Sequence, residues 1–142
     1  MSIGHNVLLD TSAVIDLERI NGKDVAAEIG CDLADLHPGI SSVTLAELAA
    51  GPHATSDPAA RAVRQARLQW AESTFDPLPF DADAARAYGV IYVLVTAMGR
   101  NPRRRLADLL IASVAVANGL PLVTRNPDDF AGLDSQVNVI SA

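Results

Sequence analysis

The sequence of 142 residues is poor in the side chains that hold small stapled or zinc-bound folds together. Its one cysteine, Cys31, cannot form a disulfide within the chain, and it excludes zinc ribbons and redox CxxC pairs. The histidines His5, His37 and His53 show no HxH or HxxxH spacing, which disfavours a histidine zinc site. This cysteine usage is typical of an intracellular protein, and we expect Cys31 to be an inert, partly buried thiol.

Long apolar runs are also lacking. No stretch approaches the roughly 18 apolar residues of a membrane span, and the N-terminal sequence MSIGHNVLLDTS has no basic region before its short apolar run. We therefore expect a cytoplasmic protein with no membrane partner. With 49% hydrophobic and 20% charged residues, the chain is not a disordered tail, and its length predicts a single domain over residues 1–142.

Positive charge is scarce, because the net charge is −6 at pH 7 and Lys23 is the one lysine. Taken alone, this balance argues against a nucleic-acid partner. The remaining cations are arginines, which bind phosphate better than lysine does. Four of them gather within six residues that contain no acid: Arg100, Arg103, Arg104 and Arg105. Net charge therefore does not exclude RNA.

Short apolar runs alternate with segments of helical spacing along the whole chain. We predict strands over residues 5–9, 39–41, 120–124 and 137–140. We predict helices over 11–20, 25–29, 43–50, 59–73, 82–98 and 106–117, the first ended by Asn21-Gly22 and the last apolar nearly all round. This order predicts an α/β fold with a mostly parallel sheet flanked by helices.

Polar side chains follow these strands where each one ends. In open parallel sheets, sites form at the carboxyl ends of the strands. Segments far apart in sequence therefore bring side chains to one edge of the sheet: Asp10, Glu47, Asp108, Thr124, Asn126, Asp128 and Asp129.

Each acid also has a purely structural interpretation. Asp10 could cap the helix that follows it, and Thr44 with Glu47 could form a capping box. Asp108 lies in a first helical turn, where the helix dipole favours an acid. Acids are common in polar loops such as 125–134.

The surroundings of two acids favour a site. Glu47 lies in an almost wholly apolar stretch, and Asp108 shares a helix face with Ala112 and Ala115, so we expect both acids to be at least half buried. Clustered buried carboxylates repel one another and need a cation. An all-oxygen set selects Mg²⁺ or Mn²⁺, which predicts a metal-dependent phosphodiester or phosphate hydrolase.

Four ordered motifs that span nearly the whole chain resemble those of PIN-domain ribonucleases. They are VLLDTS at 7–12, SVTLAEL at 42–48, ADLLIA at 107–112 and LVTRNPDDF at 122–130. More narrowly, the set resembles the VapC toxins of bacterial VapBC toxin–antitoxin pairs. The resemblance implies a PIN-like three-layer sandwich, with a central mostly parallel sheet between helices.

Carried over by motif, the resemblance assigns catalytic and metal-binding roles to Asp10, Glu47 and Asp108. Family members differ at the fourth position, which here falls on Asn126, Asp128 or Asp129. We assign it to Asp129, and Asn126 in that position would weaken the cage of a second metal. The supporting polar residues are Thr11, Thr124 and Asn126.

The resemblance also implies an activity and its partners. The activity is Mg²⁺- or Mn²⁺-dependent endonucleolytic cleavage of structured RNA (tRNA or rRNA) by metal-activated water, leaving a 5′-phosphate and a 3′-hydroxyl. The partners are a cognate VapB-like antitoxin of a type II toxin–antitoxin pair and a second copy in a homodimer. The alternative from another class is a catalytically weak PIN-like module that binds RNA or protein for regulation.

Phosphate contacts with RNA are expected at the four-arginine patch of residues 100–105, with a second approach along Arg61, Arg64 and Arg67. The alternative is that these arginines solvate helices or pair with acids such as Glu72 and Asp76. The few aromatic residues offer no evident stacking platform. We assign three of them to the core or an interface: Trp70, Tyr88 and Tyr92.

Overall fold

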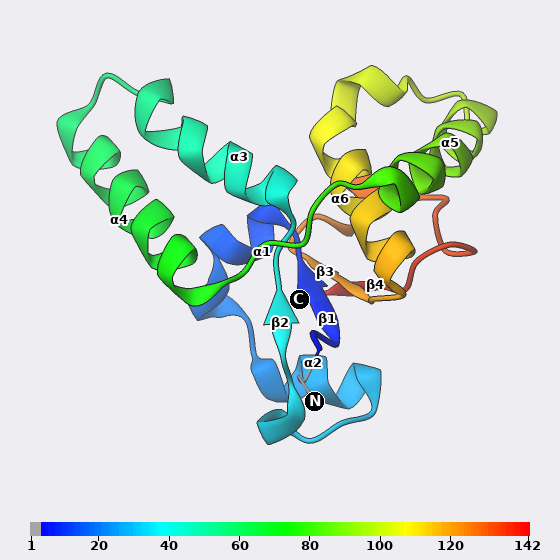
Figure 1. The fold of residues 1–142 in the computed structure, drawn as a ribbon, viewed down its shortest axis with the longest axis horizontal. Coiled ribbons are helices and arrows are strands. Elements are labelled where there is room, and N and C mark those ends of the chain that lie inside the picture. Colours follow the sequence, from blue (N-terminus) through cyan, green and yellow to red (C-terminus); the bar gives the residue numbers. More distant parts are fainter. Residues whose placement is uncertain (1–3) are drawn as a thin grey trace.

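A four-stranded parallel sheet forms the centre of the computed structural model, which describes residues 4–142 (Figure 1). The strands are β1 (Val7–Leu9), β2 (Pro38–Gly39), β3 (Leu122–Thr124) and β4 (Val139–Ser141), in the spatial order β2-β1-β3-β4. Leu8 pairs with Gly39 on one side and with Leu122 on the other. The predicted α/β fold with a parallel sheet is confirmed, and each strand lies within two residues of its predicted bounds.

Six α-helices and five 3-10 helices surround the sheet in the described part of the chain. The α-helices are α1 (Thr11–Ile15), α2 (Gly22–Ile29), α3 (Ser42–Ala50), α4 (Pro58–Thr74), α5 (Ala82–Ala97) and α6 (Leu106–Asn118). The 3-10 helices are η1 (Leu17–Arg19), η2 (Leu33–Asp35), η3 (Gly51–Ala54), η4 (Pro102–Arg105) and η5 (Pro127–Phe130). All six predicted helices are present, although their ends differ.

The helix predicted over 11–20 is wrong in its second half. α1 ends at Ile15, and after its C-cap Asp16 the chain tightens into η1. Asn21 and Gly22 do not end a helix but begin α2, because the Asn21 side chain accepts a hydrogen bond from the Lys23 amide at 3.0 Å. An asparagine followed by glycine serves equally well as an N-cap and as a stop, and only the structure distinguishes the two.

The core consists of two apolar layers, one on each face of the sheet. Alternate strand residues point to opposite faces. Leu8 and Leu122 therefore pack with α5 and α6, whereas Val7 and Val123 pack with α1 and α2. The layers confirm the three-layer sandwich, and α6 is buried over most of its surface, as its composition predicts.

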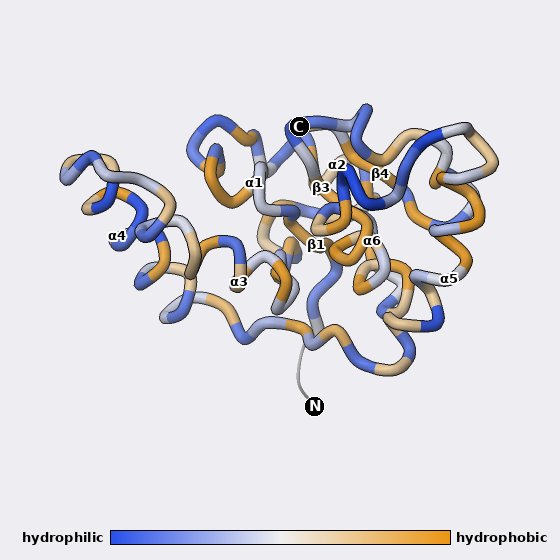
Figure 2. The backbone as a smooth tube through the Cα atoms, turned by 90° about the horizontal axis from the view of Figure 1, so that it is seen from above, coloured by the Kyte–Doolittle hydropathy of each residue, from blue (hydrophilic) through white to orange (hydrophobic). Residues whose placement is uncertain are grey.

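Helices α3 and α4 form a hairpin that extends away from the rest of the molecule (Figures 1 and 2). Arg61 and Arg64 join α4 to η3. Arg61 Nε and Nη2 donate to the carbonyls of Pro52 and Thr55 at 3.2 and 3.0 Å, and Arg64 Nη1 donates to the Gly51 carbonyl at 3.0 Å. These two arginines therefore bond to backbone carbonyls. In the described part of the chain, neither of them forms an ion pair with Glu72, Asp76 or another acid.

The aromatic residues divide between core and surface. Tyr88 packs partly buried against the core, as predicted. Trp70 and Tyr92 are 40% and 48% exposed, so their assignment to the core is wrong and an interface role stays a prediction. Cys31 is partly buried, as expected. Among residues 4–142, no helix combines the length and the apolar character that a membrane crossing requires.

Candidate functional site

Asp10 lies at the carboxyl end of the central strand β1 and is 2% exposed. Its amide donates to the Val123 carbonyl at 3.0 Å, which fixes it between β1 and β3. Its Oδ1 accepts hydrogen bonds from the Ala13 amide at 2.8 Å and from Ser12 Oγ at 2.7 Å. Asp10 therefore caps α1 through one oxygen, and the capping interpretation is confirmed.

Glu47 lies on α3, across the sheet edge from Asp10. Ser41 is the N-cap of α3, since its Oγ accepts from the Thr44 amide at 3.1 Å, so the capping box of Thr44 with Glu47 is wrong. Glu47 Oε1 instead accepts a hydrogen bond from Thr11 Oγ1 at 2.5 Å. Glu47 is exposed, contrary to prediction, because α3 buries only the face that carries Thr44 and Leu48.

Asp108 is partly buried in the first turn of α6, as predicted. Burial, together with the negative charges of Asp129, Asp10 and Glu47, raises the pKa of its carboxyl to about 6. Arg105 acts in the opposite direction. Because charge interactions weaken with distance, these effects indicate that Asp129, Asp10 and Glu47 lie near Asp108. The structure thus brings together the four acids that the sequence singles out.

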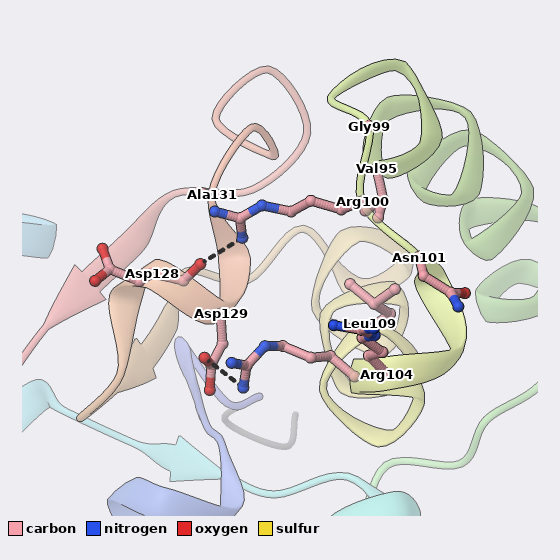
Figure 3. Close-up of a pocket in the computed structure, with 10 residues that line it drawn as sticks. Val95, Gly99, Arg100, Asn101, Arg104, Leu109, Asp128, Asp129 and Ala131 are labelled. Atoms are coloured by element: carbon pink, nitrogen blue, oxygen red, sulfur yellow. Dashed lines mark hydrogen bonds and ion pairs between the residues drawn. The ribbon is translucent and has the colours of Figure 1, made fainter.

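The fourth acid comes from η5, which follows β3. Asp129 Oδ1 pairs with Arg105 Nη1 at 2.7 Å, and the Asp129 side chain is 17% exposed. Asp128 and Asn126 are exposed, and the Asp128 carboxylate points away from that of Asp129 (Figure 3). Of the three candidates for the fourth position, Asp129 is therefore the one beside Asp108.

A hydroxyl network links Asp10 to the segment that carries Asp129. Ser12 Oγ donates to Asp10, accepts from the Arg125 amide at 3.0 Å and lies 3.3 Å from Thr124 Oγ1. Since Ser12 has one hydroxyl proton, Thr124 donates in this contact. Thr124 Oγ1 also accepts from the Asn126 amide at 2.9 Å.

Ser12 is a site residue that the sequence reasoning missed. It stands in the VLLDTS motif two residues after Asp10, and serine at that spacing commonly bonds back to a nearby carboxylate or amide. Thr124 and Thr11 occupy the supporting positions predicted for them. Asn126 contributes its backbone amide, while its side chain makes no capping hydrogen bond.

Arginines line a cavity of about 510 Å³ beside these acids (Figure 3). Arg100 Nη1 donates to the Asp128 carbonyl at 3.0 Å, and Arg105 pairs with Asp129. Arg104 lines the same cavity, and Arg103 is exposed. Within the described residues, Arg103 and Arg104 pair with no acid. The patch thus places Arg105 on the Asp129 carboxylate, and Arg100 and Arg104 in the same cavity.

The donor set suits a hard divalent cation, since the charges of three other carboxylates and of one arginine act on Asp108. Over residues 4–142, no three acidic, histidine or cysteine side chains stand in a ready-made ligand arrangement. Three of the four carboxylates each have one oxygen engaged. Asp10 accepts from Ser12, Glu47 accepts from Thr11, and Asp129 pairs with Arg105. Their second oxygens accept none of the side-chain hydrogen bonds or ion pairs seen in this part of the chain, so the residues fit a metal.

Comparison with known proteins agrees with the motifs. The PIN domain family profile matches residues 7–135. The chain is 37% identical over 132 residues to Ribonuclease VapC5 of Mycobacterium tuberculosis, covering 93% of this chain and 90% of the relative. It is 32% identical over 137 residues to VapC ribonuclease Y4jK of Sinorhizobium fredii, covering 90% and 94% respectively.

Solved structures show the same fold. The crystal structure of VapBC-5, a member of the VapBC family of toxin–antitoxin systems from Mycobacterium tuberculosis, superposes with a TM-score of 0.74 at 33% identity, covering 98% of this chain and all of that one. FitAcB from Neisseria gonorrhoeae gives a TM-score of 0.68 at 29% identity, covering 95% and 96%. The chain therefore belongs to the PIN-domain family, in the group that contains the VapC ribonucleases.

Proposed function

We propose that this protein is a metal-dependent endoribonuclease and the toxin component of a type II toxin–antitoxin pair. The observation that carries the proposal is the environment of Asp108, whose pKa is raised to about 6 by burial and by three neighbouring acids. Such a cluster is unfavourable in the free protein, and a divalent cation removes the repulsion. Perturbed carboxylates gathered at strand ends are typical of catalytic sites.

We assign metal binding to Asp10, Glu47, Asp108 and Asp129, with Mg²⁺ or Mn²⁺ as the cofactor. When bound, such an ion supplies an activated water and offsets negative charge at the scissile phosphate. The chain's own residues orient the ligands. Ser12 holds the Asp10 carboxylate by one oxygen, and Thr11 does the same for Glu47.

RNA is the proposed substrate, because the relatives are named ribonucleases and because arginines flank the acids. We assign phosphate contacts to the patch of residues 100–105. Structured tRNA or rRNA, found in the cytoplasm, is the expected target. Attack by water leaves a 5′-phosphate and a 3′-hydroxyl, whereas attack by the ribose 2′-hydroxyl would leave a 2′,3′-cyclic phosphate.

The proposed partners follow from the same relatives. VapBC-5 is named as a toxin–antitoxin system, and we extend a VapB-like antitoxin partner to this chain. We also propose a homodimer, with residues 1–142 forming one PIN-like domain in each copy.

The decisive experiment is cleavage of total tRNA and of a stem-loop RNA by antitoxin-free protein, with Mn²⁺, with Mg²⁺ and with chelator. Asp108→Asn keeps the side-chain shape but removes a ligand charge, so we expect at least a ~100-fold loss of cleavage, which sequencing gels quantify. Asp128→Asn is the matched control, because Asp128 is an exposed acid on the same turn as Asp129.

Three outcomes are informative. Metal-dependent cleavage that Asp108→Asn loses and Asp128→Asn retains supports the nuclease. Equal cleavage by both variants points to a contaminating enzyme and contradicts the site. RNA binding without cleavage under any metal condition favours the regulatory binding module instead.

A further inference from the structure

The Arg105–Asp129 ion pair places a cation of the chain itself on a carboxylate of the proposed metal site. The guanidinium Nη1 lies 2.7 Å from Asp129 Oδ1. Arg105 ends η4 and directly precedes α6, so its backbone is only three residues from Asp108. Its charge acts on Asp108 as well as on Asp129. The charge of the Arg105 guanidinium thus offsets the negative charge of two of the four acids.

The exposure of this ion pair allows it to dissociate readily. The Arg105 side chain is 53% exposed and that of Asp129 is 17% exposed, so the arginine approaches the buried acid from solvent. Half-exposed ion pairs contribute little net stability, because water and salt screen them. Over the described residues, the bond to Asp129 is the one hydrogen bond or ion pair that the Arg105 side chain makes.

From these contacts we propose that Arg105 is a displaceable internal cation that competes with the divalent metal for Asp129. The inference rests on the proposed function, because it takes Asp129 as a metal ligand. In the metal-free protein Arg105 occupies Asp129 Oδ1 and offsets the repulsion among the acids. A metal on Asp129 competes with the guanidinium for the charge of that carboxylate and repels it, so the site gives up metal affinity in exchange for stability without metal.

The cavity beside Asp129 can accommodate the Arg105 guanidinium once it is displaced. Arg105 lines the cavity of about 510 Å³ together with Arg100 and Arg104. Arg100 stays fixed there by its bond to the Asp128 carbonyl, which is independent of the Asp129 carboxylate. The phosphates of the proposed RNA substrate would supply a new partner in this cavity. Metal binding and phosphate binding are therefore coupled through one side chain.

Mn²⁺ titration of metal-stripped, antitoxin-free protein tests the competition without any activity readout. We expect Arg105→Gln to bind Mn²⁺ roughly three- to tenfold more tightly than the wild type in calorimetry, as expected from the removal of a partly exposed ion pair. Arg105→Lys keeps a cation and should stay close to the wild-type affinity. Arg103→Gln is the matched control, because it makes the same charge change two residues away without touching Asp129.

Circular dichroism establishes that each variant is folded before titration. Equal Mn²⁺ affinities for Arg105→Gln and Arg103→Gln would overturn the competition while leaving the metal site intact. Asp108→Asn separates the two ideas, since it must weaken Mn²⁺ binding if the acids form the site. If Asp108→Asn binds Mn²⁺ as well as the wild type does, the proposed metal site fails, and the competition fails with it.

Discussion

One carboxylate in this protein, that of Asp10, has both a structural role and a proposed role in the site. Asp10 caps α1 with one oxygen and remains available at the site with the other. The capping interpretation and the site interpretation of Asp10 therefore do not exclude each other, although sequence reasoning treats them as alternatives. Asp108 shows the cost of such a site, because its raised pKa reports an ionised carboxylate in unfavourable surroundings.

The Asp108 pKa predicts how stability changes with pH in the metal-free protein. A carboxyl with a folded-state pKa of about 6 binds protons more tightly than it does in the unfolded chain. Its contribution to stability therefore falls as pH rises from 4 to 6. Because water partly screens this half-buried carboxyl, we expect Asp108→Asn to remove a modest penalty and raise the melting temperature at pH 7.5 by roughly 2–6 °C, or about 0.5–1.5 kcal/mol.

Thermal denaturation in chelator at pH 7.5 and pH 4 measures this effect. The gain from Asp108→Asn should disappear at pH 4, where the wild-type carboxyl is protonated as well. Asp128→Asn, which changes an exposed acid, should alter the melting temperature little at either pH. A variant that is less stable than the wild type at pH 7.5 would contradict the crowding of acids around Asp108.

The elements of the fold were predictable wherever an apolar pattern fixes them. β1, β3 and most of α6 are buried runs, and their burial follows directly from composition. The errors fall where one residue type serves two local structures. Asn21 begins a helix instead of ending one, and Ser41, rather than Thr44, caps α3.

The site was predictable to the same extent. The order of strands places Asp10 and Asp129 at one sheet edge, which parallel topology requires. The exposure of Glu47 was not predictable, because the alanines around it are compatible with either a buried or an open helix face. Arg105 could be assigned to a basic patch, but only the tertiary structure shows that it pairs with a site acid.

η5 is held in place by Phe130, which is 1% exposed and packs in the same core cluster as α6. We expect Phe130→Leu to cost about 1–2 kcal/mol of stability, because the smaller side chain leaves a cavity. Since Asp129 directly precedes Phe130, Mn²⁺ affinity in calorimetry should fall as well. Denaturant unfolding measures the loss of stability.

Ile91→Val is the control that separates the loss of stability expected for Phe130→Leu from its expected loss of Mn²⁺ affinity. Ile91 is fully buried on α5 in the same cluster, and this substitution costs roughly 0.5–1.5 kcal/mol. It should lower stability without changing Mn²⁺ affinity. If Phe130→Leu binds Mn²⁺ as tightly as Ile91→Val does, η5 does not determine the position of Asp129.

Across the whole molecule, charge is distributed unevenly. The net charge of −6 is concentrated in part at the site, the exposed Arg104 lines the cavity beside Asp129, and the exposed Arg103 precedes it in the chain. Arg61 and Arg64, in contrast, serve the α3–α4 hairpin. An acidic protein can therefore present a basic approach to RNA over a small area.

Salt dependence of RNA binding tests this approach. In the inactive Asp108→Asn background, we expect Arg103→Gln with Arg104→Gln to reduce the slope of log affinity against log salt by about 1–2, as two phosphate contacts are lost. Arg19→Gln with Arg86→Gln is the charge-matched control, since both arginines are exposed and neither belongs to the patch of residues 100–105. Filter binding at several salt concentrations gives the slopes, and equal slopes for the two double variants would contradict the basic approach.

The central position of β1 also orders events during protein synthesis. β1 emerges first from the ribosome, yet its neighbour β3 and the acid Asp129 are translated more than 110 residues later. Asp10 and Glu47 are therefore translated well before Asp108 and Asp129. A polypeptide that terminates before Asp129 lacks the complete set of proposed carboxylates, so we expect it to have no nuclease activity.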